Sequence, residues 1–216
     1  MGKRLLPLIC ICGLLLTGCG NRQEIDDVAV ALGVAVDGGS RGGYRVTVEL
    51  AAPKAPDDLG EGVFFVSEGG DLQQALAALD CQLEKELFWG HLQVILVGES
   101  MVSRMEEISE YFHSLRQLAT SSLLVTASGP AGDMLRQGFG QADYASFGIA
   151  GAVRDALPRN VRPNLLYVME RLQKNRPLDL PCLYRQTGRE DGRLEIKIKE
   201  ETIRKDALGD HEPRHA

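Results

Sequence analysis

The sequence predicts an α+β fold, in which an antiparallel hairpin and a central sheet have helices packed on them and are followed by a helical segment. Residues 28–36 are a small-apolar run with valine at alternate positions 28, 30, 34 and 36, which is typical of a strand buried on at least one face. Apolar and polar residues alternate over residues 44–51, as they do in a strand that faces a core on one side. The run 92–98 is almost continuously apolar, which is typical of a strand in the middle of a sheet. Between these strands, apolar residues recur at helical spacing. This order of elements favours helices packed on a mixed sheet.

The first residues are typical of a lipoprotein signal peptide. Lys3 and Arg4 precede an apolar run over residues 5–16. That run is too short for a membrane span, because a spanning helix needs about 20 apolar residues. It ends in Leu16-Thr17-Gly18-Cys19, which has the order of a lipobox.

We expect cleavage between Gly18 and Cys19 and a covalent lipid on the Cys19 thiol. Residues 1–18 would then be the signal peptide and residues 19–27 a short polar tether. The two acyl chains of one lipid-modified cysteine suffice for stable anchoring, so the protein would contact the bilayer through Cys19 at an outer membrane face. The alternative is an ordinary signal peptide in which Cys19 has no role.

The charge of the chain argues against a nucleic-acid partner. The net charge is −6, with 24 basic and 30 acidic residues. Cleavage after Gly18 removes two of the basic residues and leaves 22 against 30, a net charge of −8. Binding to nucleic acid calls for clustered Lys and Arg on one face.

Two cysteines remain after maturation, because Cys10 and Cys12 leave with the signal peptide and Cys19 carries the lipid. Cys81 and Cys182 either form one disulfide or stay as two buried thiols. We favour the buried thiols, since Cys81 lies at an apolar position of a helical pattern and free cysteine behaves as a small hydrophobic residue.

A hairpin is predicted for residues 28–51. In its second strand the apolar positions alternate with Arg45, Thr47 and Glu49, so we expect that strand to be half exposed. The glycine-rich segment 38–43 lacks the Lys-Ser/Thr and the following helix of a phosphate-binding loop. It is interpreted as the hairpin turn.

Further elements follow from the periodicity. A helix is predicted over residues 71–87, capped by Asp71 or Gly70, because leucines occur at positions 72, 76, 79, 83 and 87. A second helix has the apolar face Met105, Ile108, Phe112 and Leu115. The other expected elements are a loop at 52–62, strands at 63–66 and 122–127, and helices at 130–136, 142–157 and 163–174.

The last predicted helix has the apolar stripe Leu165, Leu166, Met169 and Leu172. Residues 177–184 are expected to be extended, and residues 194–199 alternate as a strand does. From Glu200 the chain is charged, and we expect a disordered tail. The predicted domain therefore covers residues 28–185, and residues 186–216 form a terminal strand and the tail.

No catalytic residue is predicted. Residues 98–102 have the place of a nucleophile elbow around Ser100 but lack its second glycine. His91, beside Trp89, is either a structural histidine at the start of the central strand or a catalytic one, and the structural interpretation is favoured. His113 is expected on an exposed helix face, and His211 and His215 lie in the tail. No cysteine–histidine cluster, HExxH, calcium loop or dinucleotide motif is present, so no metal and no cofactor are predicted.

Three stretches together resemble the Ger(x)C spore germination lipoproteins. The first is the lipobox followed by residues 22–27, 32–37 and 44–48. The second and most specific is Leu87–Glu99, which is similar to the family's aromatic-Gly-His-Leu-x-Val-x-x-x-Gly-Glu block. The third is Leu178-Asp179-Leu180-Pro181, near the end of the family's first domain.

The resemblance covers about residues 16–185 and implies the lipid-anchored C subunit of a germinant receptor. That subunit works beside integral membrane A and B subunits in the inner spore membrane, without an established catalytic activity. Members usually continue into further domains, so the resemblance implies an N-terminal domain with the downstream domains missing. The motif residues Gly90, His91, Gly98 and Glu99 flank a buried strand and are interpreted as structural.

Two other functions are alternatives. The first is a lipid-anchored solute-binding or envelope protein, although residues 19–216 are few for two lobes and a cleft. The second is an envelope hydrolase that depends on His91.

Overall fold

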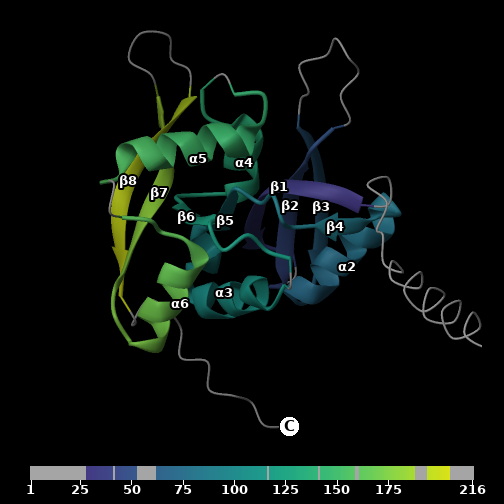
Figure 1. The fold of residues 1–216 in the computed structure, drawn as a ribbon, viewed down its shortest axis with the longest axis horizontal. Helices are drawn as coiled ribbons and strands as arrows, with labels where there is room; N and C mark the ends of the chain where they lie inside the picture. The colour runs from purple at the N-terminus through teal and green to yellow at the C-terminus, as the bar shows by residue number, and fades with distance from the viewer. Residues whose placement is uncertain are drawn as a thin grey trace, which may run out of the picture.

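The computed structural model describes residues 28–40, 42–52, 62–115, 117–140, 142–158, 161–187 and 194–204. Within them, eight strands form one mixed sheet between two layers of helices (Figure 1). The predicted α+β class is confirmed. The predicted signal peptide, the tether with Cys19 and residues 205–216 of the tail lie outside the described residues.

The sheet has a parallel centre and antiparallel flanks. Its strands follow the order β3-β2-β1-β5-β6-β7-β8, and β4 pairs in parallel with the start of β1. The neighbours β1, β5, β6 and β7 run parallel, whereas β2, β3 and β8 pair antiparallel with their neighbours. The predicted hairpin and the central position of β5 are confirmed. The strands are β1 (Val28–Gly38), β2 (Tyr44–Leu50), β3 (Val63–Gly69), β4 (Glu86–Phe88), β5 (Val94–Gly98), β6 (Leu123–Ala127), β7 (Leu178–Thr187) and β8 (Leu194–Ile203).

Helices cover both faces of this sheet (Figure 1). Buried residues of α2, α3 and α6 share one core cluster, and buried residues of α4 and α5 share a second cluster. Strand residues divide between the clusters by alternation: Val34, Val36 and Ile95 belong to the first, and Ala35, Val94 and Leu96 to the second. The helices are α2 (Leu72–Leu83), α3 (Met105–Ser114), α4 (Ala131–Gln137), α5 (Ala145–Ala156) and α6 (Leu165–Gln173), and a 3₁₀ helix, η3 (Glu99–Arg104), precedes α3.

The second face of the β1–β2 hairpin is buried, so the prediction of a half-exposed β2 is wrong. Arg45 is exposed as expected, but Thr47 and Glu49 are 2% and 0% exposed. Glu49 Oε1 accepts a hydrogen bond from the backbone N of Ala145 at 2.7 Å, and Oε2 accepts one from the N of Ser146 at 2.7 Å. These amides start α5 and have no partner within the helix, and the carboxylate charge lies at the positive end of the helix dipole.

The end of β1 holds α4 in the same way. Asp37 Oδ1 accepts a hydrogen bond from the N of Ala131 at 2.7 Å, and Oδ2 accepts one from the N of Gly132 at 2.8 Å. We call Asp37 on α4 and Glu49 on α5 the two carboxylate clamps. Both join the hairpin to helices far along the chain.

Helix α2 is shorter than predicted. Asp71 caps it, as expected, by accepting a hydrogen bond from the N of Gln74 at 2.7 Å. The helix ends at Leu83, because Glu84 adopts a left-handed conformation with φ 54°. Leu87 therefore lies in β4 and fills the core from a strand. Leu87 is four residues after Leu83, a spacing that also occurs in helices, and the predicted helix was therefore too long.

Two details differ toward the end of the chain. In α6 the buried residues are Leu165 and Val168, whereas Leu166 of the predicted apolar stripe is 47% exposed. Strand β8 continues to Ile203 by pairing with β7, so residues 200–203 are not part of a disordered tail. Charged side chains had suggested a tail, but an edge strand carries such residues on its solvent face.

The two cysteines differ in their surroundings. Both are free, Cys182 is 1% exposed, and Cys81 is exposed on α2. The prediction of two buried thiols is therefore correct for Cys182 and wrong for Cys81. No helix in the described ranges combines the length and the apolar content that a bilayer span needs.

We predict that Glu49→Ala destabilises the domain by about 3 kcal/mol, because two buried amides lose their acceptor. Glu49→Gln should lose less, since its one carbonyl oxygen still accepts a hydrogen bond. Urea unfolding measures both, with Glu110→Ala on the exposed face of α3 as control. Equal stability of Glu49→Ala and the control would contradict the role of this clamp.

We also predict that a maleimide modifies Cys81 in the native protein and modifies Cys182 only after unfolding. Burial raises the pKa of the Cys182 thiol to about 11, so the reactive thiolate is scarce as well as inaccessible. Peptide mass mapping after short labelling distinguishes the two sites. Equal native labelling would show that β7 does not shield Cys182.

Candidate functional site

Two hollows border the predicted motif around β5. The first has a volume of about 860 Å³ and lies on the α2–α3 side of the sheet. The second has a volume of about 620 Å³ and lies where the parallel strands β1 and β5 end. We call the first the acidic groove and the second the strand-end cleft. The motif residues do not converge on either one, because β5 separates its two halves by about 13 Å of strand.

The first half of the motif forms the turn between β4 and β5. Trp89 points into the core, is 6% exposed and packs edge-on against Phe112 at 5.9 Å. His91 is exposed, and its ring lies 5.8 Å from the ring of Phe88. A Cβ on Gly90 would lie 2.5 Å from the same Phe88 ring. This half of the motif is thus a tight turn that directs Trp89 inward and His91 outward.

The second half of the motif gives room to a carboxylate clamp. A Cβ on Gly98 would overlap Oδ1 of Asp37, the atom that accepts the hydrogen bond from Ala131. Glu99, which follows, is exposed at the start of η3. Gly98 therefore has an identifiable steric role, and Glu99 lines the strand-end cleft.

Several polar groups of the strand-end cleft already have partners within the fold. Asp37 is held by α4, and Asp133 forms an ion pair of 3.3 Å with Arg136. Ser100, the candidate nucleophile, accepts a hydrogen bond from the N of Gly38 at 3.3 Å. We interpret this cleft as part of the framework that joins β1 to α4.

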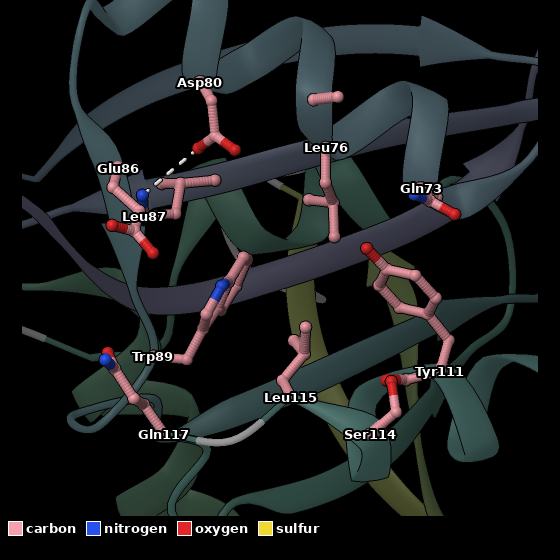
Figure 2. Close-up of a pocket in the computed structure, with 11 residues that line it drawn as sticks. Gln73, Leu76, Asp80, Glu86, Leu87, Trp89, Tyr111, Ser114, Leu115 and Gln117 are labelled. Carbon is pink, nitrogen blue, oxygen red and sulfur yellow. Dashed lines mark hydrogen bonds between the residues drawn. The ribbon is translucent and has the colours of Figure 1, made fainter.

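The acidic groove brings together side chains from distant segments (Figure 2). Helix α2, strand β4, the turn before β5 and the end of α3 surround it. Leu76, Trp89 and Leu115 lie along its middle, and Asp80 and Glu86 lie together at one end. The described residues that line it are Gln73, Leu76, Ala77, Asp80, Glu86, Leu87, Trp89, Tyr111, Ser114, Leu115 and Gln117.

Acidic side chains influence one another along this groove. Asp80 Oδ1 accepts a hydrogen bond from the N of Leu87 at 3.1 Å, drawn as a dashed line in Figure 2. Partial burial raises the pKa of Asp80, the Leu87 hydrogen bond opposes that rise, and the charge of Glu86 adds to it. Burial also raises the pKa of Tyr111, and the charges of Asp80 and Asp71 raise it further. Both groups therefore lie in surroundings that disfavour more negative charge.

The remaining sequence candidates do not assemble into a site. His113 is exposed at the end of α3, as predicted. His211 and His215 lie outside the described residues, as does Cys19. Within the described ranges, no group of three or more His, Cys, Asp or Glu side chains is placed to hold a metal ion.

Sequence reasoning did not find Asp80, Glu86 and Tyr111 as neighbours. The helix predicted over residues 71–87 places Asp80 among its polar positions and leaves no strand β4 to bring Glu86 beside it. Trp89 was the one available signal, because it is the single tryptophan and adjoins the Gly-His turn. Its inward direction becomes evident only in the fold.

Comparison with known proteins gives one consistent result. A family model described as the spore germination protein N-terminal domain matches residues 21–169. From Bacillus subtilis (strain 168), spore germination protein B3 is 27% identical over 131 residues, spore germination protein YndF is 26% identical over 168, and the putative spore germination protein YfkR is 27% identical over 146.

The three alignments include 58%, 62% and 62% of this chain but only 35%, 42% and 37% of the relatives. The chain thus spans about two fifths of the length of the curated relatives it matches. No solved structure matches the chain.

We predict that Asp80→Asn makes the domain at least as stable as the wild type at neutral pH. The folded-state pKa of Asp80 is raised, so the charged form costs stability above that pKa, and the cost disappears below the ordinary pKa of aspartate. Asparagine keeps an oxygen for the N of Leu87. Thermal unfolding from pH 3 to pH 8 should show the variant's relative advantage growing as pH rises. An advantage that shrinks with rising pH would contradict this sign.

Proposed function

This chain belongs to the family of spore germination proteins whose N-terminal domain it matches, and on that premise we propose that it is a lipid-anchored, non-enzymatic subunit of a spore germinant receptor. The observation that carries the proposal is the family match over residues 21–169. It includes the hairpin β1–β2, the central strand β5 and most of the helical layers. The resemblance seen in Leu87–Glu99 agrees with it.

The proposed anchor rests on the sequence Leu16-Thr17-Gly18-Cys19. Cleavage before Cys19 would leave eight residues between the lipid-bearing cysteine and Val28, the first residue of β1. Eight residues reach at most about 28 Å. The domain would therefore stay close to the outer face of the membrane that holds it, which we propose is the inner spore membrane.

We propose integral membrane A and B subunits as the partners. A domain held within about 30 Å of the bilayer meets their exposed parts without a long search. In this proposal the subunit acts through protein contacts in the receptor, and its one covalent addition is the lipid on Cys19.

We predict that Cys19→Ala moves the protein out of the membrane fraction and greatly slows germination through one receptor. The physical reason is that the acyl chains on Cys19 supply the membrane affinity. Fractionation of spores and the optical-density loss after each germinant measure the two effects. Cys81→Ala is the matched control, since Cys81 is exposed and remote from the lipobox.

Normal membrane retention with normal germination in Cys19→Ala spores would overturn the anchored role. Loss of retention with normal responses to every germinant would overturn the receptor role alone. The control variant should behave as the wild type in both assays.

A further inference from the structure

The two edges of the sheet carry different kinds of side chain (Figure 1). Strand β8, at one edge, has exposed charged residues, among them Lys197, Lys199 and Glu201. Charges of this kind keep an edge strand from pairing with another chain. Strand β3, at the other edge, has the sequence Val-Phe-Phe-Val-Ser-Glu-Gly. Val63 is 45% exposed and the next three residues are partly exposed, so the β3 edge is apolar, with Glu68 as its one charge.

The charge on β3 is held toward the β1–β2 hairpin. Glu68 Oε2 accepts hydrogen bonds from Oγ of Ser40 at 2.6 Å and from the N of Ser40 at 3.3 Å. Glu68 Oε1 also lies 3.9 Å from Nε of Arg45 on β2. Glu68 therefore does not protect residues 63–66 in the way that the charges of β8 protect that edge.

Backbone groups of β3 point away from the sheet at alternate residues. The N of Ala51 donates to the O of Val30 on β1 at 2.9 Å, so odd-numbered residues of β2 face β1 and even-numbered ones face β3. By the register of the β2–β3 pair, Phe65 and the other odd-numbered residues of β3 face β2. Phe64 and Val66 therefore direct their N–H and C=O groups outward, where no strand pairs with them among the described residues. Such an edge is a template for one more strand.

We propose that this strand is β3 of a second copy of the chain, paired antiparallel about a twofold axis at Phe65. In that register Phe65 lies opposite Phe65 of the second copy, and Phe64 lies opposite Val66, so apolar side chains meet on both faces of the joined sheet. Phe64 and Val66 exchange backbone hydrogen bonds across the axis. Glu68 lies opposite Gly62 and meets no like charge. A register shifted by one residue on each strand would instead place Glu68 opposite Phe64.

The sequence favours a second copy over another segment of the same chain. Apart from the expected signal peptide, the longer segments outside the described residues are 19–27, 53–61, 188–193 and 205–216. None of them has apolar residues at alternate positions over the length of a strand. β3 itself has the matching apolar residues, and every copy of the chain carries it. The inference goes beyond the proposed receptor role and does not depend on it.

Disulfide trapping tests the register. The seven residues of β3 are few beside the roughly 20–30 on each side of a stable interface, so we expect a weak, reversible dimer that a crosslink captures. The test uses the full chain in detergent solution with Phe65→Cys. The native cysteines outside the core, at positions 10, 12, 19 and 81, are replaced by alanine, so no lipid contributes.

Oxidation should give a covalent dimer of the Phe65→Cys chain. The Cα atoms of a non-hydrogen-bonded antiparallel pair lie about 4.5 Å apart, which a disulfide can bridge. Val66→Cys is the matched control, since it is one residue away on the same partly exposed edge. The two copies of residue 66 are two residues out of register, beyond the roughly 7 Å that a disulfide spans. We expect at least tenfold less dimer from this control.

A charge swap tests the same pairing without a crosslink. Phe65→Glu and Phe65→Lys each place like charges directly opposite one another at the twofold axis, which is destabilising. In sedimentation equilibrium, each variant alone should self-associate at least tenfold more weakly than the wild type. An equal mixture of the two should associate as heterodimers. Mixing would not restore association that had been lost through misfolding, and circular dichroism checks that each variant is folded.

Three results would overturn the proposal. The first is equal trapping at positions 65 and 66, which would show random collision, or trapping at position 66 alone. The second is a mixture of Phe65→Glu and Phe65→Lys that associates no more than either variant by itself. The third is a wild-type chain that stays monomeric at its highest soluble concentration while Phe65→Cys gives no covalent dimer, which would leave the β3 edge to a different protein.

Discussion

The fold depends on two carboxylates, the buried Glu49 and the half-buried Asp37, that hold the starts of α5 and α4 against the β1–β2 hairpin. Asp37 and Glu49 each accept two backbone hydrogen bonds from residues 94 to 97 positions later in the chain. Neither helix has a side-chain cap of its own. The N-terminus of each helix is therefore fixed by a tertiary contact, and the hairpin determines where both helices lie. The helix amides offset the cost of burying each charge.

These contacts require backbones to approach closely, which explains several glycines. A Cβ on Gly98 would overlap Asp37, and one on Gly132 would lie 2.5 Å from Thr47 Oγ1. A Cβ on Gly33 would lie 2.7 Å from Cβ of Ser146, the residue that Glu49 holds. The family motif glycine at position 98 is thus explained by the clamp of Asp37. A larger side chain there would displace either the carboxylate or the helix.

The limits of sequence reasoning follow from the same contacts. Alternation correctly predicted β1 and β2, and a continuous apolar run predicted the central strand, because apolar residues must meet a core. Alternation also assigned Glu49 to solvent, because a polar residue is normally exposed and the helix amides that satisfy it lie 96 residues away. The groove was missed for a similar reason. Leu87 continues the leucine spacing of α2, while the left-handed Glu84 that ends the helix has no strong local signal.

The end of α2 also determines where the groove lies relative to the proposed anchor. Because the chain turns at Glu84, β4 pairs with the first residues of β1, and Glu86 lies opposite Val28. Val28 is nine residues from Cys19, so a lipid at Cys19 places Glu86 within roughly 35 Å of the membrane surface. The acidic groove, which Glu86 lines, would then also lie close to the membrane.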